Sequence, residues 1–299
     1  MAVAIAGLGL VAVAPVTLGA PLLTMSVNGT ANTNGGVNSD SFGPTSDSNA
    51  VNGSASVISF GSLGTEQANA FAFGSDSGAY GAGSGGSAMN FLSVSHFHQT
   101  LVITNSTATA NSYNLAFNIY AGALTATSET GSGDGYAAYQ LYIAQNNGPG
   151  IIFSSTATLD DAGVLSHTGS VLDSAGLAGD TYSWMDTYVN LALGTLNAGD
   201  SMSIDYDLVT TAVGDYEYDE CAHDIYAGTG ITGTLNVNIC SSSAILGDPG
   251  VVTGIPFAVS ATPLVNDVPE PAMVSLVGAG LGALAIRRRR SKRRADGSA

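Results

Sequence analysis

Alternation of apolar and polar side chains is the clearest pattern along this chain. Between residues 113 and 119 the odd positions are Tyr, Leu, Phe and Ile, and the even positions are Asn, Ala and Asn. The same period of two returns at residues 136–145, 181–188, 202–208 and 235–239. Because successive side chains of a strand point to opposite faces, this period indicates β-strands with one apolar face. The pattern predicts about eleven to thirteen strands.

Turn-forming residues separate these segments. Gly148-Pro149-Gly150 and Asn197-Ala198-Gly199-Asp200 each lie between two alternating stretches. Short strands joined by frequent turns are typical of two-layer all-β domains. The sequence therefore predicts an antiparallel β-sandwich or jelly-roll-like body over residues 57–262. Residues 24–56 are rich in Asn, Gly, Ser, Thr and Asp, and for them we expect a polar, partly ordered leader.

The two ends of the chain are apolar without this alternation. Residues 1–23 are nearly all apolar, which is typical of the hydrophobic region of a secretory signal peptide. No basic residue precedes this region, so we expect either an upstream start or an unusual export signal. The alternative interpretation is an N-terminal core element.

A second apolar segment lies near the other end. Residues 272–286 are apolar or small and carry no charge, and they predict a short transmembrane helix after a linker at residues 263–271. The tail at 287–299 holds every Lys and Arg of the chain: Arg287, Arg288, Arg289, Arg290, Lys292, Arg293 and Arg294. Basic residues beside a membrane segment favour the cytoplasmic side, so this run predicts a cytoplasmic stop and places the body outside.

The linker ends in Val268-Pro269-Glu270-Pro271. This motif, followed by a short apolar segment and a basic end, resembles the PEP-CTERM sorting signal of bacterial exported proteins. The resemblance covers only residues 268–294 and implies that Pro269, Glu270 and Pro271 form the recognition motif. It implies processing by an exosortase, and a protein that is first anchored in the membrane and then held at the cell surface or in the extracellular matrix. It also implies a link to biofilm and to exopolysaccharide as a partner.

The charge distribution excludes several function classes. Residues 1–286 contain no Lys or Arg but 22 of the 23 acidic residues. Nucleic-acid binding depends on basic side chains, so we expect none. P-loop and kinase sites are excluded because each requires a lysine. The fold must depend on apolar burial and hydrogen bonds instead of surface ion pairs.

The chain has two cysteines, Cys221 and Cys240. An isolated pair in an exported protein predicts one disulfide. Two unpaired thiols in the core are the alternative.

Five carboxylates are concentrated around the first cysteine: Asp215, Glu217, Asp219, Glu220 and Asp224. With no cation nearby they repel one another, and Ca²⁺ would relieve the repulsion because it takes six to eight oxygen ligands on flexible loops. Asp205 and Asp207 on the preceding strand are further candidates. Ca²⁺ is therefore the cofactor that this acidic group suggests, and a solvated acidic loop pinned by the disulfide is the alternative.

His96 and His98 share one strand face because they are two residues apart. Such a pair can hold a transition metal when a third ligand comes from elsewhere. His167, His223 or an acid could supply it. Two exposed polar residues on a half-solvated strand are the alternative.

Tyr182, Trp184 and Tyr188 alternate on one predicted strand face and resemble a platform on which sugar rings stack. Asp186 lies on the same face and favours its exposure. The alternative is that these aromatic residues belong to the sandwich core.

From these observations we expect an exported, surface-anchored, non-catalytic β-sandwich protein with a structural or adhesive role in the bacterial envelope or exopolysaccharide matrix. No catalytic residue is assigned. The alternatives are a secreted glycan-active hydrolase and a calcium-dependent surface-layer component.

Overall fold

The computed structural model describes nine segments of the chain: residues 21–33, 36–61, 64–87, 89–146, 148–216, 221–226, 234–238, 240–247 and 257–264. These segments form 19 β-strands, and every strand pairing among them is antiparallel, which confirms the all-β prediction. None of them contains a helix long and apolar enough to cross a membrane. The predicted transmembrane helix at 272–286, the basic tail at 287–299 and most of the signal segment lie outside the described residues.

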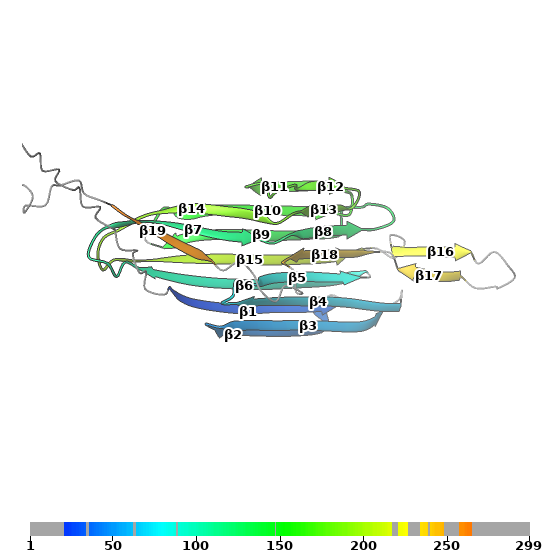
Figure 1. The fold of residues 1–299 in the computed structure, drawn as a ribbon. Coiled ribbons are helices and arrows are strands. Elements are labelled where there is room, and N and C mark those ends of the chain that lie inside the picture. The colour runs from blue at the N-terminus through cyan, green and yellow to red at the C-terminus, as the bar shows by residue number, and fades with distance from the viewer. Residues whose placement is uncertain are drawn as a thin grey trace, which may run out of the picture. The chain divides into compact units, whose positions relative to one another are not determined.

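The first sheet has seven strands (Figure 1). In spatial order they are β11 (Leu165–Gly169), β10 (Gly150–Asp160), β9 (Tyr136–Asn146), β15 (Ser201–Asp215), β6 (Asn90–Thr104), β1 (Leu22–Thr33) and β2 (Asn38–Asp47).

The second sheet also has seven strands, and a third sheet has three. The second runs β12 (Gly176–Ala178), β13 (Thr181–Trp184), β8 (Gly122–Thr127), β18 (Ser241–Leu246), β5 (Tyr80–Ser87), β4 (Gly64–Ser75) and β3 (Ala50–Gly61). The third runs β14 (Thr187–Leu196), β7 (Asn111–Ile119) and β19 (Ala258–Pro263). A separate hairpin pairs β16 (Ala222–Tyr226) with β17 (Thr234–Asn238).

The first and second sheets pack face to face as a two-layer sandwich. Strand β2 contacts β3, β1 contacts β4, β6 contacts β5, and β15 contacts β5 and β18. The third sheet continues the second layer, because only two residues separate β7 from β8 and only two separate β13 from β14. At this break Ala121 N–H donates to Asp186 Oδ1 at 2.7 Å. The alternating inward side chains of all three sheets contribute to one main core.

Aromatic rings fill the middle of that core. Tyr206 lies with its ring centroid 5.1 Å from that of Tyr80 and 5.4 Å from that of Phe257. The ring of Phe97 stacks on Tyr80 at 5.5 Å. Burial of these rings stabilises the sandwich, and the Tyr80 hydroxyl is satisfied by donating to Asn118 O at 2.6 Å.

Two of the first three strands come from the segment for which the sequence predicted a partly ordered leader. That prediction is wrong, because residues 24–56 supply most of β1, all of β2 and the start of β3. Leu22 and Leu23, assigned to the signal segment, also belong to β1. The inward positions of β1 include Met25, Val27 and Ala31. The inward positions recur with a period of two. Several of them are small residues, so the apolar face is inconspicuous beside the many polar residues of the segment.

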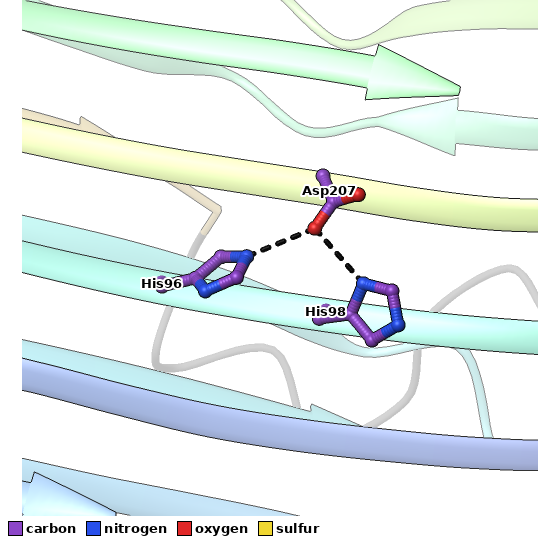
Figure 2. Close-up of side chains that lie close together, drawn as sticks. All are labelled: His96, His98 and Asp207. Atoms are coloured by element: carbon purple, nitrogen blue, oxygen red, sulfur yellow. Dashed lines mark hydrogen bonds and ion pairs between the residues drawn. The ribbon is translucent and has the colours of Figure 1, made fainter. Parts of the chain in front are cut away.

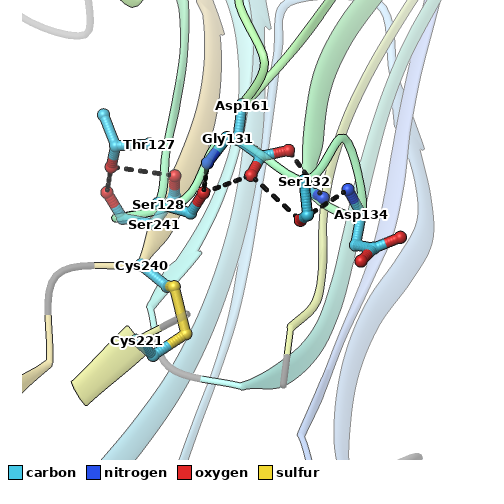
Figure 3. Close-up of a disulfide and its surroundings, with 10 residues drawn as sticks. Thr127, Ser128, Gly131, Ser132, Asp134, Asp161, Cys221, Cys240 and Ser241 are labelled. Atoms are coloured by element: carbon cyan, nitrogen blue, oxygen red, sulfur yellow. Dashed lines mark hydrogen bonds between the residues drawn. A yellow bond between two sulfur atoms is a disulfide. The ribbon is translucent and has the colours of Figure 1, made fainter. Parts of the chain in front are cut away.

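The predicted disulfide is confirmed. Cys221 and Cys240 are bonded and buried, with their Cα atoms 5.0 Å apart (Figure 3). They lie before β16 and after β17, so the bond closes the chain at the base of that hairpin. Both sulfurs belong to a smaller apolar cluster that also contains Phe91 and Tyr216.

Replacing both cysteines, Cys221→Ser with Cys240→Ser, should lower the free energy of unfolding by about 3 kcal/mol, because the bond restricts a loop of 19 residues in the unfolded chain. Urea unfolding measures this change. The wild type in reducing agent should show the same loss, and equal stability of oxidised and reduced wild type would contradict the expectation.

Glycine allows close packing around Phe91. A Cβ atom on Gly86 of β5 would lie 2.1 Å from the Phe91 ring, and one on Gly214 of β15 would lie 2.2 Å from it. Phe91 is itself buried. The ring is therefore held between a neighbouring strand of its own sheet and a strand of the facing sheet.

A Gly86→Ala substitution should destabilise the protein by about 1–3 kcal/mol, since the added methyl group overpacks against a buried ring. Gly85→Ala is the matched control on the same strand, where the nearest atom would be an ordinary 3.4 Å away. We expect it to change stability by less than about 0.5 kcal/mol. Urea unfolding compares the two, and equal effects would show that Phe91 does not limit the packing.

Candidate functional site

Two histidines project from the outward face of the first sheet. On β6 the buried residues Ser95, Phe97 and Gln99 point into the sandwich, so His96 and His98 between them point out. Their side chains are about one third exposed, at 31% and 32%. The alternation therefore places both rings on one face of β6, as the sequence predicted, and that face is half-solvated.

Asp207 of the neighbouring strand β15 joins them. The register pairs Asp207 with His98, and Asp207 also lies on an outward position of its strand. His96 Nε2 and His98 Nδ1 each lie 2.9 Å from the same oxygen, Asp207 Oδ1. Figure 2 shows both rings directed at that oxygen from β6. A single carboxylate oxygen thus bridges two imidazoles.

A second layer of hydrogen bonds fixes the ring orientations. Thr100 donates its hydroxyl proton to Asp205 Oδ1 at 2.8 Å. The Thr100 oxygen therefore accepts from His98 Nε2–H at 3.1 Å. On the other side, the Asn28 amide of β1 donates to His96 Nδ1 at 3.3 Å. Three adjacent strands hold the cluster in place.

Electrostatics favours the charged form of this bridge. The hydrogen bonds from His96 and His98 hold the pKa of Asp207 well below its usual value of 3.8, against the opposing effect of partial burial. The hydrogen bond to Asp207 raises the pKa of His98 above 6.5. Both ion pairs found in the described part of the chain involve Asp207. Since residues 1–286 contain no Lys or Arg, histidine is the only cationic side chain available there.

His96, His98 and Asp207 form the one group of three metal-binding side chains found in the described segments, with their ligand atoms all within 4.8 Å of one another. The sequence paired the histidines but left the third ligand open. His167 lies on the edge strand β11, with its ring nitrogen 3.2 Å from Ser170 O. The His223 side chain lies outside the described atoms. Asp207 could be named only with the register of β15 against β6.

The predicted calcium ligands fall mostly outside the described atoms. This applies to Glu217, Asp219 and Glu220, and to the side chain of Asp224. Asp215 is exposed at the end of β15, where it accepts a hydrogen bond from Asn90 at 3.2 Å. Calcium binding by this group stays a prediction.

The predicted sugar platform is wrong. Tyr182 and Trp184 are buried at 4% and 3% exposure, whereas Tyr188 is exposed at 62%. The strand breaks at Met185 and Asp186, so the alternation resumes in β14 one residue out of phase. The Trp184 indole donates to Tyr120 O at 3.1 Å and belongs to the core.

Comparison with known proteins identifies the tail. A family model of the PEP-CTERM protein-sorting motif matches residues 267–290, which confirms the predicted resemblance. This signal marks an exported protein that an exosortase sorts to the cell envelope or surface. No curated protein matches the chain. Among solved structures, a chain from "Structure of infectious bursal disease virus Gx strain" is 12% identical over 90% of this chain and 75% of that chain. Its TM-score of 0.11 carries no argument about the fold.

The bridge should make stability depend on pH. A lowered Asp207 pKa contributes stability above about pH 3.8, and this contribution is lost as the pH falls. A raised His98 pKa contributes stability below about pH 6.5, and this contribution is lost as the pH rises through the folded value. With a metal chelator present, Asp207→Asn should therefore lower the free energy of unfolding by about 1 kcal/mol near pH 5, a value that allows for solvent screening. The decrease should be smaller at pH 8 and at pH 3.

Urea unfolding at the three pH values measures this difference. Asp134→Asn, which removes an exposed carboxylate from the loop before β9, is the matched control and should show no such window. A loss from Asp207→Asn that is the same at pH 5 and pH 8 would contradict the expectation.

Proposed function

We propose that this chain is a non-catalytic protein with a structural or adhesive role in the bacterial envelope or exopolysaccharide matrix. The sorting motif at residues 267–290 carries the proposal, because it directs the body to the surface. A two-layer sandwich presents two broad outer sheet faces, and such faces suit contact with extended polymers.

The roles of individual carboxylates support a non-catalytic body. Buried Asp161 accepts hydrogen bonds from Ser128, Ser132 and the Gly135 N–H, and so holds the loop between β8 and β9 (Figure 3). Asp186 accepts from a backbone N–H at the strand break. Glycoside hydrolysis needs two carboxyl groups facing one substrate, whereas these two have structural partners.

Charge restricts the partner. With 22 acidic residues and no Lys or Arg, residues 1–286 repel anionic polysaccharides. A neutral glycan meets no such barrier. Neutral sugars bind through hydroxyl groups, so amide and hydroxyl side chains on an exposed sheet face are suitable partners.

A shallow groove of about 250 Å³ on the second sheet offers such side chains. It crosses β4, β5 and β18 and is lined by Gln67, Asn69, Phe71 and Ser243. The groove exists because β5 is rich in glycine, and the Phe71 ring lies over Gly83 where a Cβ atom would be 2.3 Å away. A ring beside amides and hydroxyls is suited to a sugar.

Cosedimentation of the purified chain with neutral and with acidic insoluble polysaccharides tests this role. We expect binding to the neutral polymer, and a roughly fivefold or greater loss when Gln67→Ala and Asn69→Ala are combined, because each removes hydrogen bonds worth about 1 kcal/mol. Gln140→Ala, on the exposed face of β9, is the matched control and should bind normally.

The same samples are assayed for new reducing ends. Release of reducing ends would support the hydrolase alternative and overturn a non-catalytic role. Binding that is equal for neutral and acidic polymers would contradict the charge argument.

A further inference from the structure

We propose that His96, His98 and Asp207 bind a divalent transition-metal ion such as Zn²⁺. The ligand atoms would be His96 Nε2, His98 Nδ1 and Asp207 Oδ1, the three that converge in Figure 2. The site would lie on the outward face of the first sheet.

The spacing of the ligand atoms fits a metal ion with little movement. Two of the three separations are 2.9 Å, and none exceeds 4.8 Å. Zinc takes nitrogen and carboxylate oxygen at about 2.0–2.2 Å, so ligand atoms in a tetrahedral site are roughly 3.3 Å apart. Opening each short contact by about 0.4 Å would therefore admit the ion. Rotation of two partly exposed imidazoles achieves this without moving the strands.

The hydrogen-bond pattern leaves one imidazole nitrogen facing an anion. Because Thr100 gives its proton to Asp205, its oxygen takes the proton of His98 Nε2. In the neutral ring, this tautomer points the Nδ1 lone pair at the Asp207 carboxylate. For the neutral ring, a metal ion between Nδ1 and Oδ1 would replace this unfavourable contact with two coordinate bonds. For the protonated ring, the metal ion displaces the Nδ1 proton that is shared with Asp207.

The surrounding groups have the arrangement expected of an outer coordination shell. Metal-bound histidines usually donate their other N–H to an oxygen, which fixes the ring and raises its basicity. His98 already does so through Thr100, which is in turn bonded to Asp205. At His96 the Asn28 carboxamide is in place, and rotating it would present its oxygen to Nδ1–H.

Ligand chemistry selects a transition metal rather than calcium. Two imidazole nitrogens and one carboxylate suit zinc, nickel or copper, whereas calcium takes only oxygen. Three protein ligands leave a fourth position to solvent, since all three side chains are about one third exposed. That position is accessible to a water molecule or to a donor from outside the chain.

Isothermal titration of the full chain with ZnCl₂, in an excess of calcium to occupy acidic residues, tests the site. We expect one zinc ion per chain at this site, and Co²⁺ should give the visible absorption of a coordinated ion. The His96→Ala, His98→Ala double variant should lose this binding. His167→Ala, which removes a half-buried histidine on the edge strand β11, is the matched control and should retain it.

A second variant tests the site independently, in case the double variant does not fold. Thr100→Val keeps all three ligand atoms but removes the partner of His98 Nε2, and should weaken zinc binding roughly ten- to a hundredfold. Circular dichroism confirms that each variant is folded. Absence of stoichiometric zinc binding in the wild type, or zinc affinity unchanged in both the double variant and Thr100→Val, would overturn the proposal.

Discussion

Backbone hydrogen bonding between long antiparallel strands is the interaction on which the rest of this structure depends. A body without Lys or Arg cannot use the ion pairs that commonly link neighbouring strands on exposed faces. Strands of up to 15 residues supply continuous ladders instead, and β6 and β15 pair along their whole length. Histidine takes over the cationic role at the centre of that pair. The bridge at Asp207 is therefore a direct result of the composition.

Close packing of the two layers also depends on small side chains. Glycines on β4, β5 and β15 let the two layers approach, and the rings of Phe91 and Phe97 occupy the space that a Cβ atom would have taken. On the opposite face of β5, Gly83 and Gly85 make the surface hollow. Core packing and surface relief thus have one origin in the glycine content of a few strands.

Much of the fold could be predicted from local pattern. The alternation at residues 113–119 and 202–208 gave the correct inward faces, and the cysteine pair gave the correct disulfide. The strand at 22–33 was missed because hydrophobicity identifies large inward residues better than Ala31 or Gly29. The aromatic platform was misplaced because no local pattern marks the break at Met185, which reverses the phase of β14. The partnership of His98 with Asp207 joins residues 109 positions apart, so it depended on a register that no single strand encodes.

The order of strands in the first sheet also governs when the protein can fold. Strand β6 lies between β1, which precedes it in the chain, and β15, which comes about a hundred residues later. Pairings over such distances form slowly, because the entropy of closing a long loop must be overcome before any contact stabilises it. The centre of the sandwich therefore cannot form until the chain as far as residue 215 is available for pairing. A chain whose central pairing is completed late stays unfolded for longer, and only an unfolded chain can pass through a narrow membrane channel.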